Sequence, residues 1–370
     1  MAPIVVVGGG IVGASVAFHL RNADRDVILY ERDTPGAGTT GDSIAQFVTH
    51  QEDPDPTEYR LRERAWEWYS EHAAAGRFSF EQIGTLHAAG SPETMTHVED
   101  LVARHRELGV DVELRSAADL AEFGIAPSAV EGGAYFPRDG YLDPAEIVQY
   151  FLGEAADAGV GIETGVAVTD VLTEGGAVAG VETSDGTVEA SAVVNAAGPW
   201  SGRIDDMVGV SLPIRHTYGP ILVLRADHEV RMPLTFFDEG YYLREEGRDQ
   251  VFAGRFAVDY GNAHDLDPDR VHRIDQEFHL GVGDLLATTV PNLADADVTG
   301  EWVGLRTVTP DGHPIVGPTG LDGYYVACGM SGYGIVRAPV VGEVLADLVT
   351  DATDGTGGEF RDHVSPDRFG

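Results

Sequence analysis

The start of the chain combines short apolar runs with a glycine-rich stretch. Residues 4–7 are branched apolar side chains, which is typical of a buried parallel strand. Glycines follow at once, residues 14–20 can then continue as a helix, and a second apolar run at 27–30 ends in Glu31. This order of strand, helix and strand predicts a βαβ unit.

Other parts of the chain show other patterns. Residues 211–302 mix apolar and polar positions, with runs such as 221–224 and 241–244, and this predicts strands of an antiparallel sheet. The stretch 161–168 is also expected to form a single strand.

Two helices outside the βαβ unit are predicted. An amphipathic pattern covers residues 57–75. A second helix is expected to begin at Asp143, which can cap it, with Pro144 at its first position. Its apolar positions share one helical face: Ile147, Phe151, Leu152 and Ala155.

The charge is unusual and changes the picture of the surface. The 370 residues include 61 Asp and Glu against 24 basic residues, all of them arginine, for a formal net charge of −37. The acids are spread along the chain, so they predict a solvated acidic surface suited to high salt, and we expect a halophilic source. Such a surface would repel nucleic acid and anionic membranes. No stretch reaches the roughly 20 apolar residues that span a bilayer, so we expect no membrane insertion.

The cysteine and histidine content limits which disulfides and metal sites the chain can form. The single cysteine, Cys328, excludes an internal disulfide framework and a cysteine-rich metal site. The histidines show no short metal-binding spacing, so no metal is predicted, and His216 and His313 are expected to be structural. Because no basic segment precedes the first apolar run, as it would in a secretory signal, a cytoplasmic location is the default expectation.

The glycine-rich stretch GGGIVG at residues 8–13 matches the dinucleotide-binding fingerprint GxGxxG. Gly8 allows the tight turn, Gly10 lets the backbone approach a pyrophosphate, and Gly13 lets helix and strand pack closely. The helix start would present free amides to the phosphates, while Glu31 would accept hydrogen bonds from ribose hydroxyls. The fingerprint is compatible with NAD or FAD, and a glycine-rich turn in an unrelated α/β protein is the alternative.

Five later stretches point to FAD. They are GAGTTGDS at 36–43, GYLDP at 140–144, VVNAAGPWS at 193–201, GLRTVTPDGHPIVG at 304–317 and GYYVACGMSGYGI at 323–335. In this order they resemble the FAD-dependent D-amino acid oxidase superfamily, nearest to its glycine oxidase, sarcosine oxidase and dimethylglycine dehydrogenase branches. The resemblance covers almost the whole chain.

The resemblance implies an α/β protein with two domains. A discontinuous, Rossmann-like FAD-binding domain would comprise residues 1–45, 140–210 and 303–370. An α+β substrate domain with a mainly antiparallel sheet would comprise residues 46–139 and 211–302.

The resemblance also implies which residues contact FAD. Sarcosine oxidases tether their flavin through a cysteine before the TPD turn; residues 303–308 contain none, so we expect non-covalent FAD, with Cys328 as a small buried residue rather than a tether. The expected FAD-binding residues are Gly8, Gly10, Ile11, Val12, Gly13, Glu31, Arg32, Thr39, Thr40, Ser43, Val166, Ala197, Gly198, Gly329, Ser331, Gly332, Tyr333, Gly334 and Ile335.

Four residues are the candidates for the substrate side. Arg306 matches the carboxylate-binding arginine of the D-amino acid and glycine oxidases, and its planar fork suits a carboxylate. Tyr242 resembles a substrate-domain tyrosine over the flavin; a register shift by one residue would put Tyr241 there instead. Arg244 would share the strand face of Tyr242. His50 follows the stretch 36–43, which resembles the loop that crosses the flavin in that family.

The resemblance implies an oxidoreductase that acts on the C–N bond of a small amino acid or an N-methylated glycine. Hydride would pass to flavin N5, and water would hydrolyse the imine. The electron acceptor, O2 or an unidentified carrier, stays open, because the lysine that activates oxygen in sarcosine oxidases has no counterpart. A homo-oligomer is compatible with the sequence. The alternatives are a 2-hydroxy-acid dehydrogenase, for which His50 would be the base, and a flavin-binding electron-transfer subunit.

Overall fold

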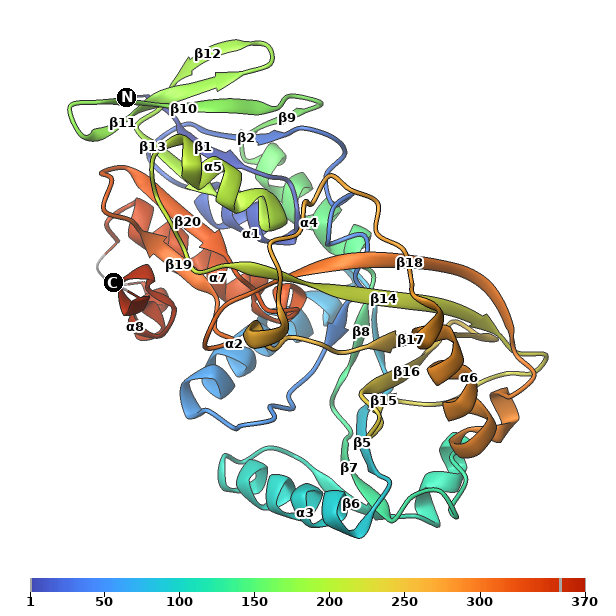
Figure 1. The fold of residues 1–370 in the computed structure, drawn as a ribbon. Helices are drawn as coiled ribbons and strands as arrows, with labels where there is room; N and C mark the ends of the chain where they lie inside the picture. The colour runs from blue at the N-terminus through green and yellow to red at the C-terminus, as the bar shows by residue number, and fades with distance from the viewer. Residues whose placement is uncertain (1, 353–354, 370) are drawn as a thin grey trace.

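The computed structural model describes residues 2–352 and 355–369 (Figure 1). Its longer helices are α1 (Ile11–Leu20), α2 (Pro56–Ala74), α3 (Pro92–Glu107), α4 (Pro144–Asp157), α5 (Ser201–Met207), α6 (Gln276–Thr289) and α7 (Gly334–Val349), followed by the short α8 (Arg361–Val364). Its strands are β1 (Ile4–Val7), β2 (Val27–Glu31), β3 (Gln46–Phe47), β4 (Phe80–Gln82), β5 (Thr85–Ala89), β6 (Glu113–Ser116), β7 (Gly132–Phe136), β8 (Gly140–Leu142), β9 (Gly161–Thr164), β10 (Val168–Glu174), β11 (Ala177–Thr183), β12 (Gly186–Glu189), β13 (Ala192–Asn195), β14 (Arg215–Arg225), β15 (Leu234–Phe236), β16 (Tyr241–Glu246), β17 (Gln250–Arg255), β18 (Asp297–Val308), β19 (Ile315–Pro318) and β20 (Tyr324–Cys328).

The first large sheet contains the predicted βαβ unit. Its order is β19-β20-β13-β1-β2-β9, and every pair in it is parallel except β19 with β20. All four residues of β1 are buried because β1 lies inside the sheet and both of its faces are covered. Ile4 and Val6 pack in one core with α1, α4 and α7, whereas Val5 and Val7 pack in another with the small sheet β10-β11-β12. The central strand is therefore apolar without alternation.

The second large sheet is mainly antiparallel. Its order is β18-β14-β17-β16-β15-β5-β7-β6, with β15 and β5 as its parallel pair. One face packs against α6, whose buried residues Phe278, Val282 and Leu285 join Leu222 and Leu243 of the sheet in one core. The predicted combination of a parallel Rossmann-like sheet with a mainly antiparallel one is confirmed.

Most predicted elements form, and one is shorter than expected. Helix α2 agrees with the predicted 57–75 to within one residue at each end, and the Asp143 carboxylate caps α4 through the amides of Ala145 (2.7 Å) and Glu146 (3.1 Å). The single strand expected at 161–168 is wrong: β9 ends at Thr164. Gly165 has a φ of +73°, and the Val166 amide then donates to the Glu31 carbonyl.

The long strands β14 and β18 lie side by side over most of their length (Figure 1). Their pairing runs from Arg215 with Val308 to Arg225 with Asp297, so the predicted boundary at residue 303 falls inside a strand of the antiparallel sheet. The division into an FAD-binding and a substrate domain stays our proposal, with that boundary moved to about residue 309.

No helix within the described residues is long and apolar enough to cross a membrane.

Candidate active site

The turn between β1 and α1 depends on glycine. Gly8 has a φ of +104°, a conformation that glycine adopts without strain. A Cβ added at Gly13 would overlap the Gly8 carbonyl oxygen, so α1 can approach the turn this closely only without a side chain there. Helix α1 begins after Gly10, which has no side chain to cap it. The first turn of α1 is therefore left with backbone amides at its start.

Two side chains hold this turn from outside. The Glu31 carboxylate, at the end of β2, accepts hydrogen bonds from the amides of Gly9 (2.7 Å) and Asp33 (2.8 Å). The Thr40 hydroxyl accepts one from the Ile11 amide (3.1 Å). The loop after β2 is thus fixed against the helix start.

A cavity of about 660 Å³ extends along this turn to the loop after β20. It is lined by every residue predicted to bind FAD except Gly13, Ser331 and Tyr333. Gly13 packs against the turn, Ser331 is buried with its hydroxyl donating to the Gly329 carbonyl (3.3 Å), and Tyr333 lines a neighbouring cavity. Other residues also line this cavity that were not predicted to bind FAD, among them Trp200, Arg203 and Met207.

Cys328 lines the same cavity but is poorly suited to form a covalent bond. Burial raises the pKa of its thiol well above the ordinary value, followed by a smaller effect of the Asp205 carboxylate. The thiol therefore stays protonated near neutral pH, and the thiolate is the nucleophilic form.

A second cavity, of about 690 Å³, adjoins the first and is lined in part by β14, β15, β16 and β18 of the antiparallel sheet. The residues that line both are Thr39, Ser43, Arg306, Gly332 and Ile335. Their position at the junction means that a group bound there can contact occupants of both cavities.

Arg306 has no acidic partner at this junction. Its Nη1 donates to the Tyr218 carbonyl (2.8 Å) and its Nη2 to the Arg255 carbonyl (3.0 Å), while its guanidinium lies 5.5 Å from the centre of the Phe256 ring. Among the residues that the structure describes, no carboxylate lies within ion-pair distance of it. In a chain with this excess of acids, a partly buried arginine that pairs with backbone carbonyls and with no carboxylate has its charge available for a bound anion.

The strand β16 places Tyr242, not Tyr241, in the second cavity. Tyr242 is 3% exposed; burial raises the pKa of its phenol, and the nearby Arg306 and Arg244 oppose that rise. Tyr241 instead reaches α6, where a Cβ on Gly281 would overlap its hydroxyl.

Arg244 does not line either cavity, which corrects the expectation that it faces the substrate. Its Nη2 pairs with Glu246 (2.6 Å), and its guanidinium stacks 3.9 Å from the centre of the Tyr141 ring. Arg244 follows Tyr242 by two residues, but its side chain lies over the small sheet that contains β8 instead.

His50 does line the second cavity, in a cluster that the sequence did not reveal. Its ring lies 3.6 Å from that of His87 and 5.8 Å from that of His105 (centre to centre). Burial, followed by His87 and His105, lowers the pKa of His50 well below its usual value. His50 is therefore uncharged at neutral pH.

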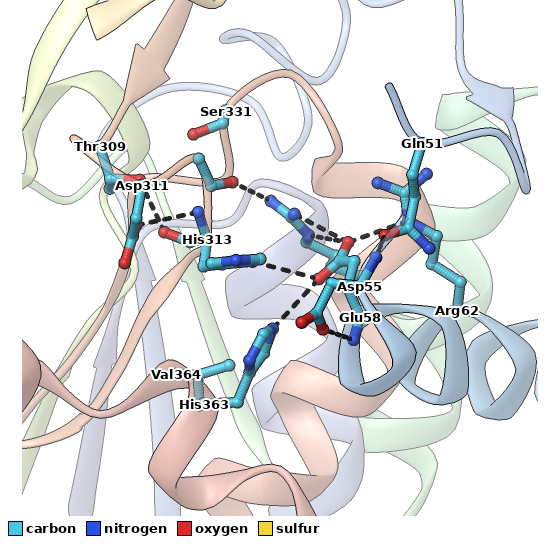
Figure 2. Close-up of polar contacts among 12 residues, drawn as sticks. Gln51, Asp55, Glu58, Arg62, Thr309, Asp311, His313, Ser331, His363 and Val364 are labelled. Carbon is cyan, nitrogen blue, oxygen red and sulfur yellow. Dashed lines mark hydrogen bonds and ion pairs between the residues drawn. The ribbon is translucent and has the colours of Figure 1, made fainter. Parts of the chain in front are cut away.

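A buried ionic network on α2 was also not predicted (Figure 2). Glu58 is 2% exposed, and its Oε1 accepts hydrogen bonds from Arg62 Nε (2.9 Å) and from Arg337 Nε (3.0 Å) and Nη2 (2.8 Å). Burial alone would raise the pKa of Glu58, but Arg337 and Arg62 outweigh it and hold that pKa well below its usual range.

Arg337 and Arg62 also connect Glu58 to two different segments that line the second cavity. Arg337 also donates to the carbonyls of Met330 (2.9 Å) and Gly312 (3.1 Å), and Arg62 to that of His50 (2.6 Å). Glu58 thereby fixes the loop after β20 relative to the segment that carries His50.

Comparison with known proteins agrees with this geometry. The profile of the FAD dependent oxidoreductase family matches residues 3–348. The chain is 28% identical to the mitochondrial dimethylglycine dehydrogenase of Rattus norvegicus over 94% of its own length and 43% of that protein's, so it spans less than half of this relative. It is 26% identical to the glycine oxidase of Geobacillus kaustophilus, covering 94% and 92% of the two chains. The crystal structure of L-proline dehydrogenase from P. horikoshii superposes with a TM-score of 0.88 at 26% identity, covering 100% and 97%.

Proposed function

This chain belongs to the family of FAD dependent oxidoreductases, and from that membership we propose that it oxidises the C–N bond of a small amino acid or an N-methylated glycine. The predicted family and its FAD cofactor are thereby confirmed. The three relatives are named for a glycine derivative, glycine and proline, and this supports an amino acid as substrate. The imine that forms would be hydrolysed by water.

The first cavity fits FAD in shape and in donor chemistry. Two helices, α1 and α7, start at it, and neither Gly10 nor Tyr333 before them provides a side-chain cap, although the Ile11 amide donates to Thr40. Backbone amides from both ends of the chain therefore face one cavity. Amides at helix starts suit phosphates and other negatively charged edges. Glu31 lines it at the end of β2, where it would accept hydrogen bonds from the ribose. We propose that FAD is held there without a covalent bond, since the Cys328 thiol stays protonated.

The observation that carries the proposed activity is the unpaired Arg306 at the junction of the two cavities. When bound, FAD supplies a hydride acceptor at N5 of its ring system. Arg306 would bind the substrate carboxylate through both of its terminal nitrogens and so hold the adjacent C–H toward the first cavity. Tyr242 would donate a second hydrogen bond to the same carboxylate.

Aromatic and neutral residues form the part of the second cavity near Arg306. Phe236 and Phe256 line it next to the uncharged His50. An apolar wall excludes water and strengthens the charge interaction with Arg306. We also propose that the neutral imidazoles allow the substrate amine to bind in its uncharged form. Its lone pair is then free, as the reaction requires.

A 2-hydroxy acid is the second candidate substrate, and the presence of His50 in the cavity is the observation in its favour. Hydroxyl oxidation needs a base, and a neutral imidazole can accept a proton. The lowered pKa of His50 makes it a weak base, which favours the amine.

The acidic composition supports a further proposal about the environment. With a net charge of −37 and no lysine, the protein would work in concentrated salt, and we propose a halophilic, cytoplasmic setting. Its electron acceptor would be O2 or a separate carrier, which oxygen consumption and dye reduction distinguish.

Anaerobic bleaching of the flavin spectrum tests the activity. We expect sarcosine, dimethylglycine, glycine or proline to bleach it and 2-hydroxyglutarate to leave it unchanged. The variant Arg306→Gln should raise the apparent Kd of the substrate about 100-fold, since two hydrogen bonds to a carboxylate are together worth about 3 kcal/mol. Arg215→Gln, on the neighbouring strand and stacked on Tyr260, is the control and should bind normally. Bleaching by none of the amino acids would contradict the proposal.

A further inference from the structure

Three buried polar atoms without a hydrogen-bond partner converge beside the start of α2 (Figure 2). They are Glu58 Oε2, His313 Nδ1 and His363 Nε2. Oε2 lies 3.7 Å from Nδ1 and 3.6 Å from Nε2, and all three atoms lie within 4.8 Å of one another. These distances are too long for direct hydrogen bonds. Buried polar atoms are normally paired, so three such atoms facing one point indicate a missing ligand.

The carboxylate is held so that one oxygen faces the imidazoles. Oε1 is occupied by Arg62 and Arg337, and turning the group would break those bonds. Oε2 therefore faces His313 and His363, and Glu58 itself is 2% exposed.

His313, at the end of the 309–313 turn, is also held in place. Its amide donates to Asp311 Oδ1 (3.1 Å), and its carbonyl accepts from Thr309 Oγ1 (2.7 Å) and Arg368 Nη2 (2.9 Å). These bonds fix the backbone of His313 and so limit the positions that its imidazole can take.

We propose that Glu58 Oε2, His313 Nδ1 and His363 Nε2 bind one divalent transition-metal ion of the zinc class. Bonds of about 2.1 Å to such an ion would make the two carboxylate–imidazole pairs, 3.6–3.7 Å apart, subtend about 120°, and small movements of the side chains would close this angle toward the tetrahedral value. Two imidazoles and one carboxylate match the ligands that zinc prefers, whereas Mg²⁺ and Ca²⁺ prefer oxygen. Glu58 and His313 line the second cavity, so water would complete the coordination from that side.

The neighbouring arginines limit the affinity. Arg62 and Arg337 already carry two positive charges beside one carboxylate, and a divalent ion adds to them. We therefore expect a dissociation constant in the micromolar range rather than the far tighter binding of structural zinc sites. The ion would clamp α8 and the 309–313 turn onto α2.

The sequence could not reveal this site, and the proposal replaces the prediction of no metal. The three ligands are residues 58, 313 and 363, so they form no local motif. His313 appeared to be a structural histidine of a turn.

Zinc titration of the chelator-treated, FAD-loaded protein tests the proposal by calorimetry. Wild type should bind one Zn²⁺ per chain, and zinc should raise its melting temperature. His363→Gln and His313→Gln should each weaken binding at least about 30-fold, because even the loss of a residue that only orients a ligand typically weakens binding about 10–100-fold. His228→Gln, at an exposed histidine beside Asp227, should bind like wild type. Glu58 is left intact because its replacement would also disrupt the arginine network.

Two outcomes would overturn the site. One is no binding to wild type at about 1 mM Zn²⁺, well above the expected constant. The other is binding of one ion that both histidine variants keep. A crystal grown with Zn²⁺ separates an ion from an ordered water: anomalous scattering between the three atoms supports the proposal, and a water without it rejects the proposal.

Discussion

Two adjacent tyrosines have different surroundings on opposite sides of β16. Tyr242 lines the second cavity near Arg306, while Tyr241 packs against Gly281 of α6. Tyr242→Phe should raise the apparent Kd of the substrate about 10-fold, because one hydrogen bond to a carboxylate is lost and the ring is kept. Tyr241→Phe is the control and should leave binding unchanged. Spectral titration of both variants measures the difference, and equal effects would argue against a role for Tyr242.

Asp139 links the stability of the protein to pH. Burial raises the pKa of Asp139 to about 6, against the hydrogen bonds that its Oδ1 accepts from the amide (2.9 Å) and hydroxyl (2.6 Å) of Thr49. A folded-state pKa above the unfolded value of about 3.9 means that the contribution to stability is present at low pH and is lost as pH rises through 6.

Asp139→Asn should therefore gain stability relative to wild type as pH rises. Between pH 4.5 and 7.5 the difference in free energy of unfolding should shift by about 2 kcal/mol in favour of the variant. Other buried acids, such as Asp205, titrate in both proteins, so their contributions cancel in the difference between variant and wild type. Thermal unfolding at constant salt measures this, and a pH-independent difference would contradict it.

At this scale the sequence identified residues that belong to motifs and missed residues whose role depends on burial. Arg306 stands in a motif, and Tyr242 could be placed once the strand register was known. Glu58 and Arg62 lie on an amphipathic helix, where charged positions usually face solvent, yet here they are buried against Arg337. Such a pairing joins residues 279 positions apart, and no local pattern encodes it.

At the scale of elements, the β1–α1 turn has the strictest requirement. Gly13→Ala would place a methyl group on the Gly8 carbonyl, so the turn must open. We expect the variant to be isolated with most of its FAD lost. Gly153→Ala, on an exposed part of α4 where a Cβ meets nothing within 4 Å, is the control. It should keep FAD and gain up to about 1 kcal/mol from helix propensity. The flavin content per chain, read from absorbance, decides between the outcomes.

Elements with strong local signals were predictable, and the failure at 161–168 has a physical cause. The apolar run there continues past Thr164, but Gly165 turns the chain and the Val166 amide bonds to β2 at Glu31. That bond depends on a residue 135 positions earlier in the chain, which periodicity alone does not indicate.

At the scale of the whole molecule, repulsion among acids should dominate the response to salt. Raising NaCl from about 0.1 to 2 M shortens the screening length from about 10 Å to a few ångströms, so the melting temperature should rise. Replacing three exposed acids by glutamine, Glu107, Glu131 and Glu174, should raise the melting temperature at low salt and reduce its salt dependence. A melting temperature that falls with salt in wild type would reject this explanation.

The pairing of β1 also affects synthesis on the ribosome. β1 has β2 on one side, which follows it closely in the chain, but on its other side Ile4 pairs with Ala192 of β13, and β13 in turn pairs with Tyr324 of β20. One neighbour of the first strand is therefore made long after it. At about 5–20 residues per second, roughly 10–40 s pass before β13 emerges. During that interval the edge of β1 that β13 will cover stays unpaired on an apolar segment of the nascent chain, which makes the earliest part of the protein a natural client for chaperones.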